Sequence, residues 1–416
     1  MEGWVGLGHS MTPEALFTVA LGLGEGWSVK QCSFEGTPPE LLLKLDFKSG
    51  HRFGCPECGA SCPTHDTVVK RWRHLDFFQY RCELEARVPR VECGEHGVRL
   101  IDVPWGRAGS GFTLLFEALV MMVCREMPMA AAATLLNEHD TRLWRVVAHY
   151  VEKAQAERDW SHLKNILIDE TSSKRGHRYV TNFVDATTRE LLLMVEGHGV
   201  DAIAAFHAEL ARHNGRAEKI ELLSMDMKPA FIAGAHRYFP KAEVVFDHFH
   251  IMQMAGKALD QVRKALAWEG AQMKGSLWAI RGNAWTRSSS QMEKRQLLCN
   301  AYPKLARALG LMDLLQDILS EEDPEMLAWW CQRASRSRLE PFVRLSRSIK
   351  AHWNGVVAFM RTRLTNGAME AINGLLQLAK RLARGFRSLR HFRIMAYLKA
   401  GKLQLNIPSL RPLPTH

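Results

Sequence analysis

Two short apolar segments, each ending in an aspartate, constrain the fold more than any other feature of the chain. Residues 165–169 read NILID, and residues 220–226 read IELLSMD. Short apolar runs of this kind are typical of buried strands. Further strand patterns follow at 179–184, 191–195 and 244–246, with a helical pattern at 201–212. The succession predicts an α/β sheet that brings Asp169 and Asp226 to one edge.

A third acidic residue, Glu370, begins an amphipathic helix predicted from about residue 368 to 384. Polar side chains recur along it at three or four residues and therefore share one face: Glu370, Asn373, Gln377, Lys380 or Arg381, and Arg384. Along this face the groups run from a carboxylate through amides to cations. This order suits a metal ligand followed by phosphate contacts. The DNA-contact candidates here are Lys380, Arg381, Arg384 and Arg387, and the alternative is an ordinary solvated face.

Two strand-end aspartates and one helical glutamate can hold a pair of Mg²⁺ (or Mn²⁺) ions for phosphodiester chemistry. We therefore take Asp169, Asp226 and Glu370 as candidate catalytic residues and metal ligands. A single aspartate at a strand end is more often a turn former, and three other carboxylates compete in this region: Glu170, Asp185 and Asp247.

The net charge supports a polyanionic partner. The chain has 416 residues, a formal net charge of +11 and a pI near 9.3. No stretch reaches the roughly 18 consecutive apolar residues that a membrane span needs. We expect a cytoplasmic protein with no membrane partner.

The cysteines predict a structural zinc site. Residues 55–59 (CPECG) form a CxxC knuckle, and residues 93–96 (CGEH) supply a second pair of ligands. The expected ligands are Cys55, Cys58, Cys93 and His96, with Cys62, His65 and Cys82 as competing candidates. Ordinary packing of reduced cysteines is the alternative. Between the knuckles lies a basic, aromatic stretch whose Arg71 and Arg73 are candidates for phosphate contact.

A helix-turn-helix is predicted after the zinc site. Residues 129–136 form a short Ala-rich helix, residues 138–140 a turn, and residues 141–150 an amphipathic second helix. In a DNA-reading unit the second helix enters the major groove, which makes Arg142 and Arg145 candidate DNA contacts. A helical hairpin that serves only packing is the alternative.

Taken together, these motifs resemble the DDE transposases of bacterial insertion sequences. The resemblance rests on residues 364–367 (LTNG) before Glu370, and on Lys380-Arg381 and residues 385–387 (GFR) after it. Residues 55–59, 72–76 (WRHLD) and 93–98 (CGEHGV) point more narrowly to the ISL-three group, over essentially the whole chain. The resemblance implies Asp169, Asp226 and Glu370 as metal ligands. It also implies that Asp247 and His250 belong to a D-x-x-H motif beside the active site.

The resemblance implies a multidomain α/β plus α protein. The expected parts are an N-terminal region 1–107 with a zinc finger at about 50–107, a helix-turn-helix domain 108–160, an RNase H-like catalytic core 161–258 and 361–404, a helical insertion 259–360, and a tail 405–416. The insertion carries six of the twelve tryptophans, most of which we expect in its core.

The activity implied is recognition of terminal inverted repeats, followed by Mg²⁺-dependent strand cleavage and transfer into target DNA. Pairing of two ends implies at least a homodimer in the synaptic complex, in a bacterial, nucleoid-associated setting. Two other functions remain open from the residues: a non-catalytic DNA-binding regulator, and an RNase H-like nuclease that cuts RNA–DNA hybrids.

Overall fold

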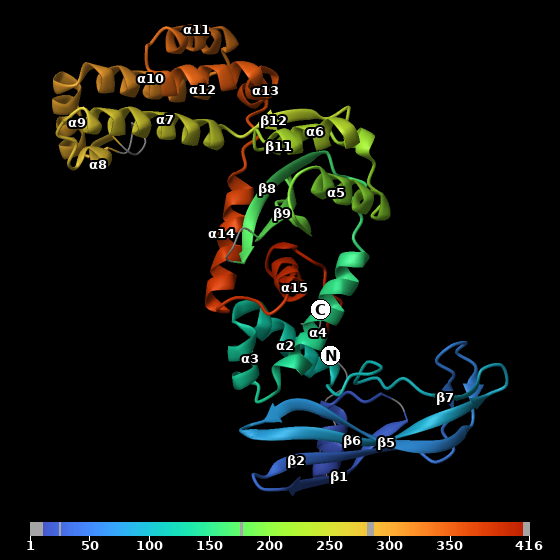
Figure 1. Ribbon diagram of the computed structural model, residues 1–416. Helices are drawn as coiled ribbons and strands as arrows, with labels where there is room; N and C mark the ends of the chain where they lie inside the picture. The colour runs from blue at the N-terminus through green and yellow to red at the C-terminus, as the bar shows by residue number, and fades with distance from the viewer. Residues whose placement is uncertain (1–10, 25, 175–177, 281–286, 411–416) are drawn as a thin grey trace, which may run out of the picture. The chain divides into compact units, whose positions relative to one another are not determined.

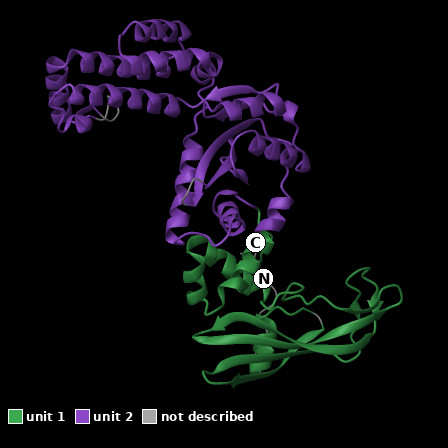
Figure 2. Ribbon diagram, viewed as in Figure 1, with its two compact units in different colours: residues 1–150, 404–416 green, residues 151–403 purple. Residues whose placement is uncertain are grey.

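The protein, seen in a computed structural model, consists of two compact units (Figure 2). Unit 1 comprises residues 1–150 and 404–416, and unit 2 comprises residues 151–403. The structure describes residues 11–24, 26–174, 178–280 and 287–410; the end of the predicted tail, 411–416, lies outside them. Among the described helices, none combines the length and the apolar character that crossing a bilayer requires.

Unit 1 is built on a five-stranded sheet. Its strands are β1 (Trp27–Glu35), β2 (Glu40–Phe47), β5 (Thr64–Phe77), β6 (Tyr80–Cys93) and β7 (Gly97–Leu100). The order is β1-β2-β6-β5, and β7 also pairs with β6. Alternate residues of the strands, among them Trp27, Leu43 and Leu84, are buried in one core together with Trp105. Helix α1 (Pro13–Ala20) begins at Thr12, whose hydroxyl accepts from the backbone N–H of Ala15.

Two smaller parts complete unit 1. Strands β3 (Phe53–Gly54) and β4 (Ser61–Cys62) form a separate hairpin. Helices α2 (Leu114–Glu126), α3 (Met129–Leu135) and α4 (Asp140–Ala156) follow the sheet. The predicted helix-turn-helix corresponds to α3 and α4, and α4 continues six residues beyond the predicted end because its apolar positions do.

Unit 2 contains a second five-stranded sheet in the order β10-β9-β8-β11-β12 (Figure 1). Its strands are β8 (Asn165–Lys174), β9 (Arg178–Asp185), β10 (Leu191–Glu196), β11 (Leu222–Met225) and β12 (Glu243–Phe246). The first three are antiparallel, and β11 and β12 run parallel to β8. Helices α5 (Val200–Arg212) and α6 (Pro229–Tyr238) pack against each other, and a 3₁₀ turn η1 (Ala217–Lys219) precedes β11. The mixed α/β fold predicted here is confirmed.

The strand register places three aspartates at one edge of this sheet. Ser224 of β11 lies opposite Leu167 of β8, and Met225 lies opposite Phe246 of β12. Continued by one or two residues, this register sets Asp226 level with Asp169 and with Asp247. The strand pairing therefore gathers the three carboxylates just beyond the ends of β11 and β12. The prediction that Asp169 ends its strand is wrong, because β8 continues to Lys174 by pairing with β9.

Helices follow β12 to the end of unit 2. They are α7 (His248–Trp268), α8 (Ser276–Ile280), α9 (Ser289–Ala301), α10 (Pro303–Ser320), α11 (Pro324–Ser335), α12 (Glu340–Ala351), α13 (Trp353–Thr362), α14 (Gly367–Leu382) and α15 (Leu389–Ala400). Helix α7 packs on α10 and α12, while α14 packs on β8 and α15 on β10. Of the tryptophans expected to be in the core, Trp330 is fully buried but Trp268 is 92% exposed, and Trp285 lies outside the described residues.

Candidate active site and zinc site

The side chains of Asp169, Asp226 and His250 meet at the edge of the unit 2 sheet. One ligand atom of each lies within 4.8 Å of those of the other two. Asp169 belongs to β8, Asp226 follows β11, and His250 is in the first turn of α7. The Nε2 atom of His250 is 2.6 Å from Oδ1 of Asp226. Two aspartates that are distant in the sequence are therefore brought together, as the strand pattern predicts.

A buried carboxylate lies behind His250. Asp247 is 1% exposed, and its side chain caps α7 by accepting from the backbone N–H of Phe249. Its Oδ2 is 3.5 Å from Nδ1 of His250. Burial alone would raise the pKa of Asp247, but the contacts with His248, His250 and the Phe249 N–H outweigh it and lower that pKa. The contacts with Asp226 and Asp247 raise the pKa of His250 to about 10.

The carboxylate of Asp169 is held from two sides. Its Oδ1 accepts from the backbone N–H of Glu170 at 2.7 Å, and its Oδ2 accepts from Nδ2 of Asn373 at 2.8 Å. The Oδ1 of Asn373 in turn accepts from Nδ2 of Asn182, the cross-strand neighbour of Asp169 on β9, at 2.8 Å. Burial, with the nearby Asp226 charge adding to it, raises the pKa of Asp169 to about 6.

One lysine offsets the negative charge of the cluster. The Nζ atom of Lys228 lies 2.8 Å from Oε2 of Glu170 and 3.6 Å from Oδ2 of Asp226. The competing carboxylate Asp185 has a different role, since it accepts from the N–H groups of Thr187 and Thr188 in a turn. Sequence reasoning missed Lys228 and Asn182. Only the position of Lys228, two residues after Asp226, could have drawn attention to it.

Glu370 is not part of the Asp169–Asp226–His250 group. It is exposed in the first turn of α14. The same face of α14 is docked on β8 one turn later by Asn373. Farther along, Gln377 donates to Thr171 Oγ1 at 2.7 Å and Lys380 to the Ser172 carbonyl at 2.6 Å. The polar stripe predicted to follow a DNA strand thus serves, in its middle part, to attach the helix to the sheet.

The predicted DNA contacts divide into two groups. Arg145, Arg381, Arg384 and Arg387 are exposed. The others are engaged within the protein: Lys380 as above, Arg71 with Glu85 at 2.6 Å, and Arg142 with Glu138 and over the Phe112 ring.

The prediction that Arg73 contacts DNA is wrong. Its side chain is 2% exposed, pairs with Asp76 and donates to the His74 carbonyl. It also lies 3.7 Å from the buried carboxylate of Glu138. Trp72 lies in the core of the sheet, so Arg73 is on the opposite face of β5, where Glu138 and the ring of Phe116 cover it.

The four predicted zinc ligands come together in unit 1. The Sγ atoms of Cys58 and Cys93 are 3.7 Å apart, and Nδ1 of His96 is 3.8 Å from Cys55 Sγ and 3.6 Å from Cys93 Sγ. These separations match the edges of a tetrahedron with Zn–S bonds of about 2.3 Å and a Zn–N bond of about 2.0 Å. The backbone N–H groups of His96 and Glu95 lower the pKa of the Cys93 thiol to about 7. The competing candidates Cys62, His65 and Cys82 lie outside this group.

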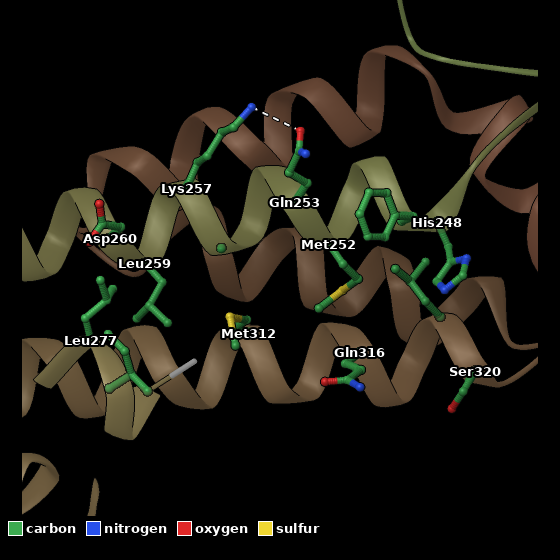
Figure 3. Close-up of a pocket in the computed structure, with 14 residues that line it drawn as sticks. His248, Met252, Gln253, Lys257, Leu259, Asp260, Leu277, Met312, Gln316 and Ser320 are labelled. Atoms are coloured by element: carbon green, nitrogen blue, oxygen red, sulfur yellow. Dashed lines mark hydrogen bonds between the residues drawn. The ribbon is translucent and has the colours of Figure 1, made fainter. Parts of the chain in front are cut away.

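In unit 2, a cavity of about 770 Å³ opens between α7 and α10 (Figure 3). His248 and Phe249, the neighbours of Asp247 and His250, lie at one end of its lining. Met252 and Met312 line its walls together with four further apolar side chains and five polar ones.

Family comparisons place this architecture in a class. A DDE transposase domain of the ISL3 type matches residues 166–396. The helix-turn-helix domain of transposase family ISL3 matches residues 101–151, and the zinc-finger of transposases IS204/IS1001/IS1096/IS1165 matches residues 51–96. A zinc-finger module, a helix-turn-helix and a catalytic domain with clustered carboxylates define a DNA-binding enzyme of the transposase class.

The chain belongs to the ISL3 family of DDE transposases. The transposase for insertion sequence element IS1557 of Mycobacterium tuberculosis is 28% identical over 436 residues, which cover 94% of this chain and 97% of that protein. The transposase for insertion sequence element IS1001 of Bordetella parapertussis is 26% identical over 90% of this chain and 95% of that protein.

Proposed function

We propose that this transposase binds the terminal inverted repeats of its insertion sequence and catalyses Mg²⁺-dependent cleavage and transfer of DNA strands. Asp169, Asp226 and Glu370 are the proposed metal ligands. The meeting of Asp169 and Asp226 at one sheet edge, inside the segment that matches the transposase domain, is the observation that carries the proposal. Divalent ions there activate a water or a 3′-hydroxyl and stabilise the leaving oxygen.

The protein's own groups prepare this site. Asn373 and the Glu170 N–H fix the orientation of the Asp169 carboxylate, and Asp247 orients His250. Lys228 balances part of the negative charge before metal binds. Glu370 is exposed one turn before Asn373 on the helix that docks beside Asp169, which supports its assignment as the third acidic ligand.

We assign the domains as predicted from the sequence. Residues 161–258 and 361–404 form the proposed RNase H-like core, which is supported by a sheet of three antiparallel strands continued by two parallel ones. Residues 259–360, from the second half of α7 to most of α13, form the proposed insertion. The zinc finger at about 50–107 and the helix-turn-helix at 108–160 form the proposed end-binding part, with structural Zn²⁺ held by Cys55, Cys58, Cys93 and His96.

For DNA contacts we propose Arg145 on the second helix of the helix-turn-helix and the exposed arginines after Glu370: Arg381, Arg384 and Arg387. Joining two ends in one reaction requires both to be held together, so we propose a homodimer or larger assembly as the synaptic complex.

The test uses the full chain with labelled inverted-repeat DNA and Mg²⁺. Asp169→Asn and Asp226→Asn are each expected to reduce cleavage at least about a thousandfold while DNA binding stays near wild type, because each removes a metal ligand. Asp201→Asn, at an exposed position in α5, is the matched control and should cut normally. Normal cutting by both active-site variants would refute the assignment, and selective cutting of RNA–DNA hybrids would favour a nuclease.

A further inference from the structure

We propose that Nε2 of His250 is a direct ligand of a divalent cation that Asp169 and Asp226 also hold. The first metal position would then have two carboxylates and one imidazole, in addition to whatever Glu370 contributes. This inference rests on the proposed metal-dependent reaction. It goes further by giving the His250 side chain a ligand role and Asp247 a positioning role.

The contact between His250 and Asp226 is the first observation. Their Nε2 and Oδ1 atoms are only 2.6 Å apart, yet Oδ1 of Asp226 is a buried atom that accepts no aligned hydrogen bond from the described residues. Buried acceptors are nearly always satisfied, so an atom of this kind requires a partner. A cation bound to both atoms would satisfy it after displacing to solvent the proton that lies between Nε2 and Oδ1 in the metal-free protein. Ligands about 2.1 Å from one ion lie about 3 Å from each other, so the two atoms need to move apart only slightly.

The second observation is the carboxylate behind the ring. Asp247 is 1% exposed, and its Oδ2 faces Nδ1 of His250 at 3.5 Å. Neither atom hydrogen-bonds another described residue. Histidines that bind metals nearly always present the second ring nitrogen to a carboxylate or a carbonyl, which fixes the tautomer and aims the ligating nitrogen. Asp247 occupies that position, and the Phe249 N–H holds it in place.

A role of His250 as a mere counter-charge is less well supported. Lys228 already lies 3.6 Å from the other oxygen of Asp226. A ring nitrogen is a softer donor than a carboxylate oxygen, so a site that includes it favours Mn²⁺ over Mg²⁺ more strongly than an all-oxygen site does. The cation preference of this transposase therefore depends on one imidazole.

The experiment is Mn²⁺ binding to the full-length, zinc-loaded protein without DNA, followed by electron paramagnetic resonance. Loading with zinc keeps Mn²⁺ away from His96. Pulsed measurements on wild type should show ¹⁴N coupling from one imidazole. His250→Gln should abolish the coupling and raise the Mn²⁺ dissociation constant more than about tenfold, and Asp247→Asn should raise that constant about 10–100-fold. His248→Gln, the matched control two residues away, should keep the coupling.

Three results would overturn the proposal: no Mn²⁺ binding by wild type, binding without ¹⁴N coupling, or coupling that survives in His250→Gln. A separate assay addresses the proposed function. If the coupling is present but element ends are never cut, the transposition chemistry is wrong while the ligand assignment stands. If ends are cut and the coupling is absent, the ligand assignment of His250 is wrong while the transposition chemistry stands.

Discussion

Asn373 joins three elements of the active-site region through one amide. It donates to Asp169 on β8 and accepts from Asn182 on β9, although it belongs to α14. Hydrogen bonds to a carboxylate are worth about 1.5–3 kcal/mol. We expect Asn373→Ala to reduce end cleavage about 10–100-fold and to raise the Mg²⁺ concentration needed for half-maximal rate. A Mg²⁺ titration of initial cleavage rates measures both.

Gln377→Ala is the control for this prediction. Gln377 lies one turn farther along α14 and attaches the same helix to β8, but it contacts Thr171 and Ser172 rather than Asp169. Its removal should loosen the helix without changing the Mg²⁺ requirement. Equal Mg²⁺ dependence in the two variants would mean that Asn373 acts only by holding the helix.

Arg73 and Arg71 are two residues apart on β5 and differ sharply in surroundings. Arg73 lies beside the buried Glu138, whereas Arg71 is 57% exposed and pairs with Glu85. Removing one member of a buried ion pair costs about 3–5 kcal/mol. Because Arg81 and Arg142 still pair with Glu138, we expect Arg73→Ala to lower the free energy of unfolding by an amount near the lower end of this range. Arg71→Ala should change the free energy of unfolding by less than about 1 kcal/mol. Urea unfolding of the two variants tests the difference.

The sequence does not reveal this difference between the two arginines. Both belong to one basic stretch, and the strand alternation alone puts them on the same side. Glu138 is brought over Arg73 by the fold, from the turn between α3 and α4, far along the chain. A single sequence contains no sign of that pairing.

At the scale of elements, the zinc site depends on two tight turns. Each turn has a glycine in the left-handed region, Gly59 at φ 73° and Gly97 at φ 67°, where other residues are strained. We expect Cys58→Ala to lose bound zinc and to make the turn between β3 and β4 accessible to protease, because residues 56–61 are all exposed and the metal would hold this turn in place. Metal analysis and limited proteolysis provide the readout.

Cys62→Ala is the matched control for the zinc prediction. Cys62 is buried on β4, in the same hairpin; its thiol donates to the Ala60 carbonyl and lies near Cys93, but it is not a member of the four-residue group. The Cys62→Ala protein should keep one zinc per chain. Loss of zinc from Cys62→Ala with retention in Cys58→Ala would contradict the ligand set.

Most elements around the active site were predictable because their signals are local. The strands at 166–168, 179–184, 191–195 and 244–246 and the helix at 201–212 are all present. Apolar runs and helical spacing depend only on neighbouring residues. The long β5–β6 hairpin is not evident from the sequence, since charged residues interrupt its apolar pattern every few positions. Its continuity comes from pairing between strands.

At the scale of the molecule, the candidate site was predictable in its acidic residues but not in its assembly. Asp169 and Asp226 each end an apolar run, which is readable in the sequence, although Asp169 lies in the middle of β8 rather than at its end. That Asn182, Asn373 and Lys228 would contact them depends on strand register and on how α14 docks, and both are long-range. Glu370 was identified by its motif, yet in this structure it stays outside the ligand group.

The excess of positive charge, +11 over the whole chain, should make DNA binding strongly dependent on salt. Each arginine that neutralises a phosphate contributes about one unit to the slope of log binding constant against log salt. Arg381 and Arg387 are exposed, so the double variant to alanine should reduce the slope by about two. Arg390→Ala should reduce it much less, because Glu152 already pairs with Arg390 through contacts at 2.9 Å. Fluorescence anisotropy with end DNA at several salt concentrations measures the slopes; an unchanged slope in the double variant would place the DNA path elsewhere.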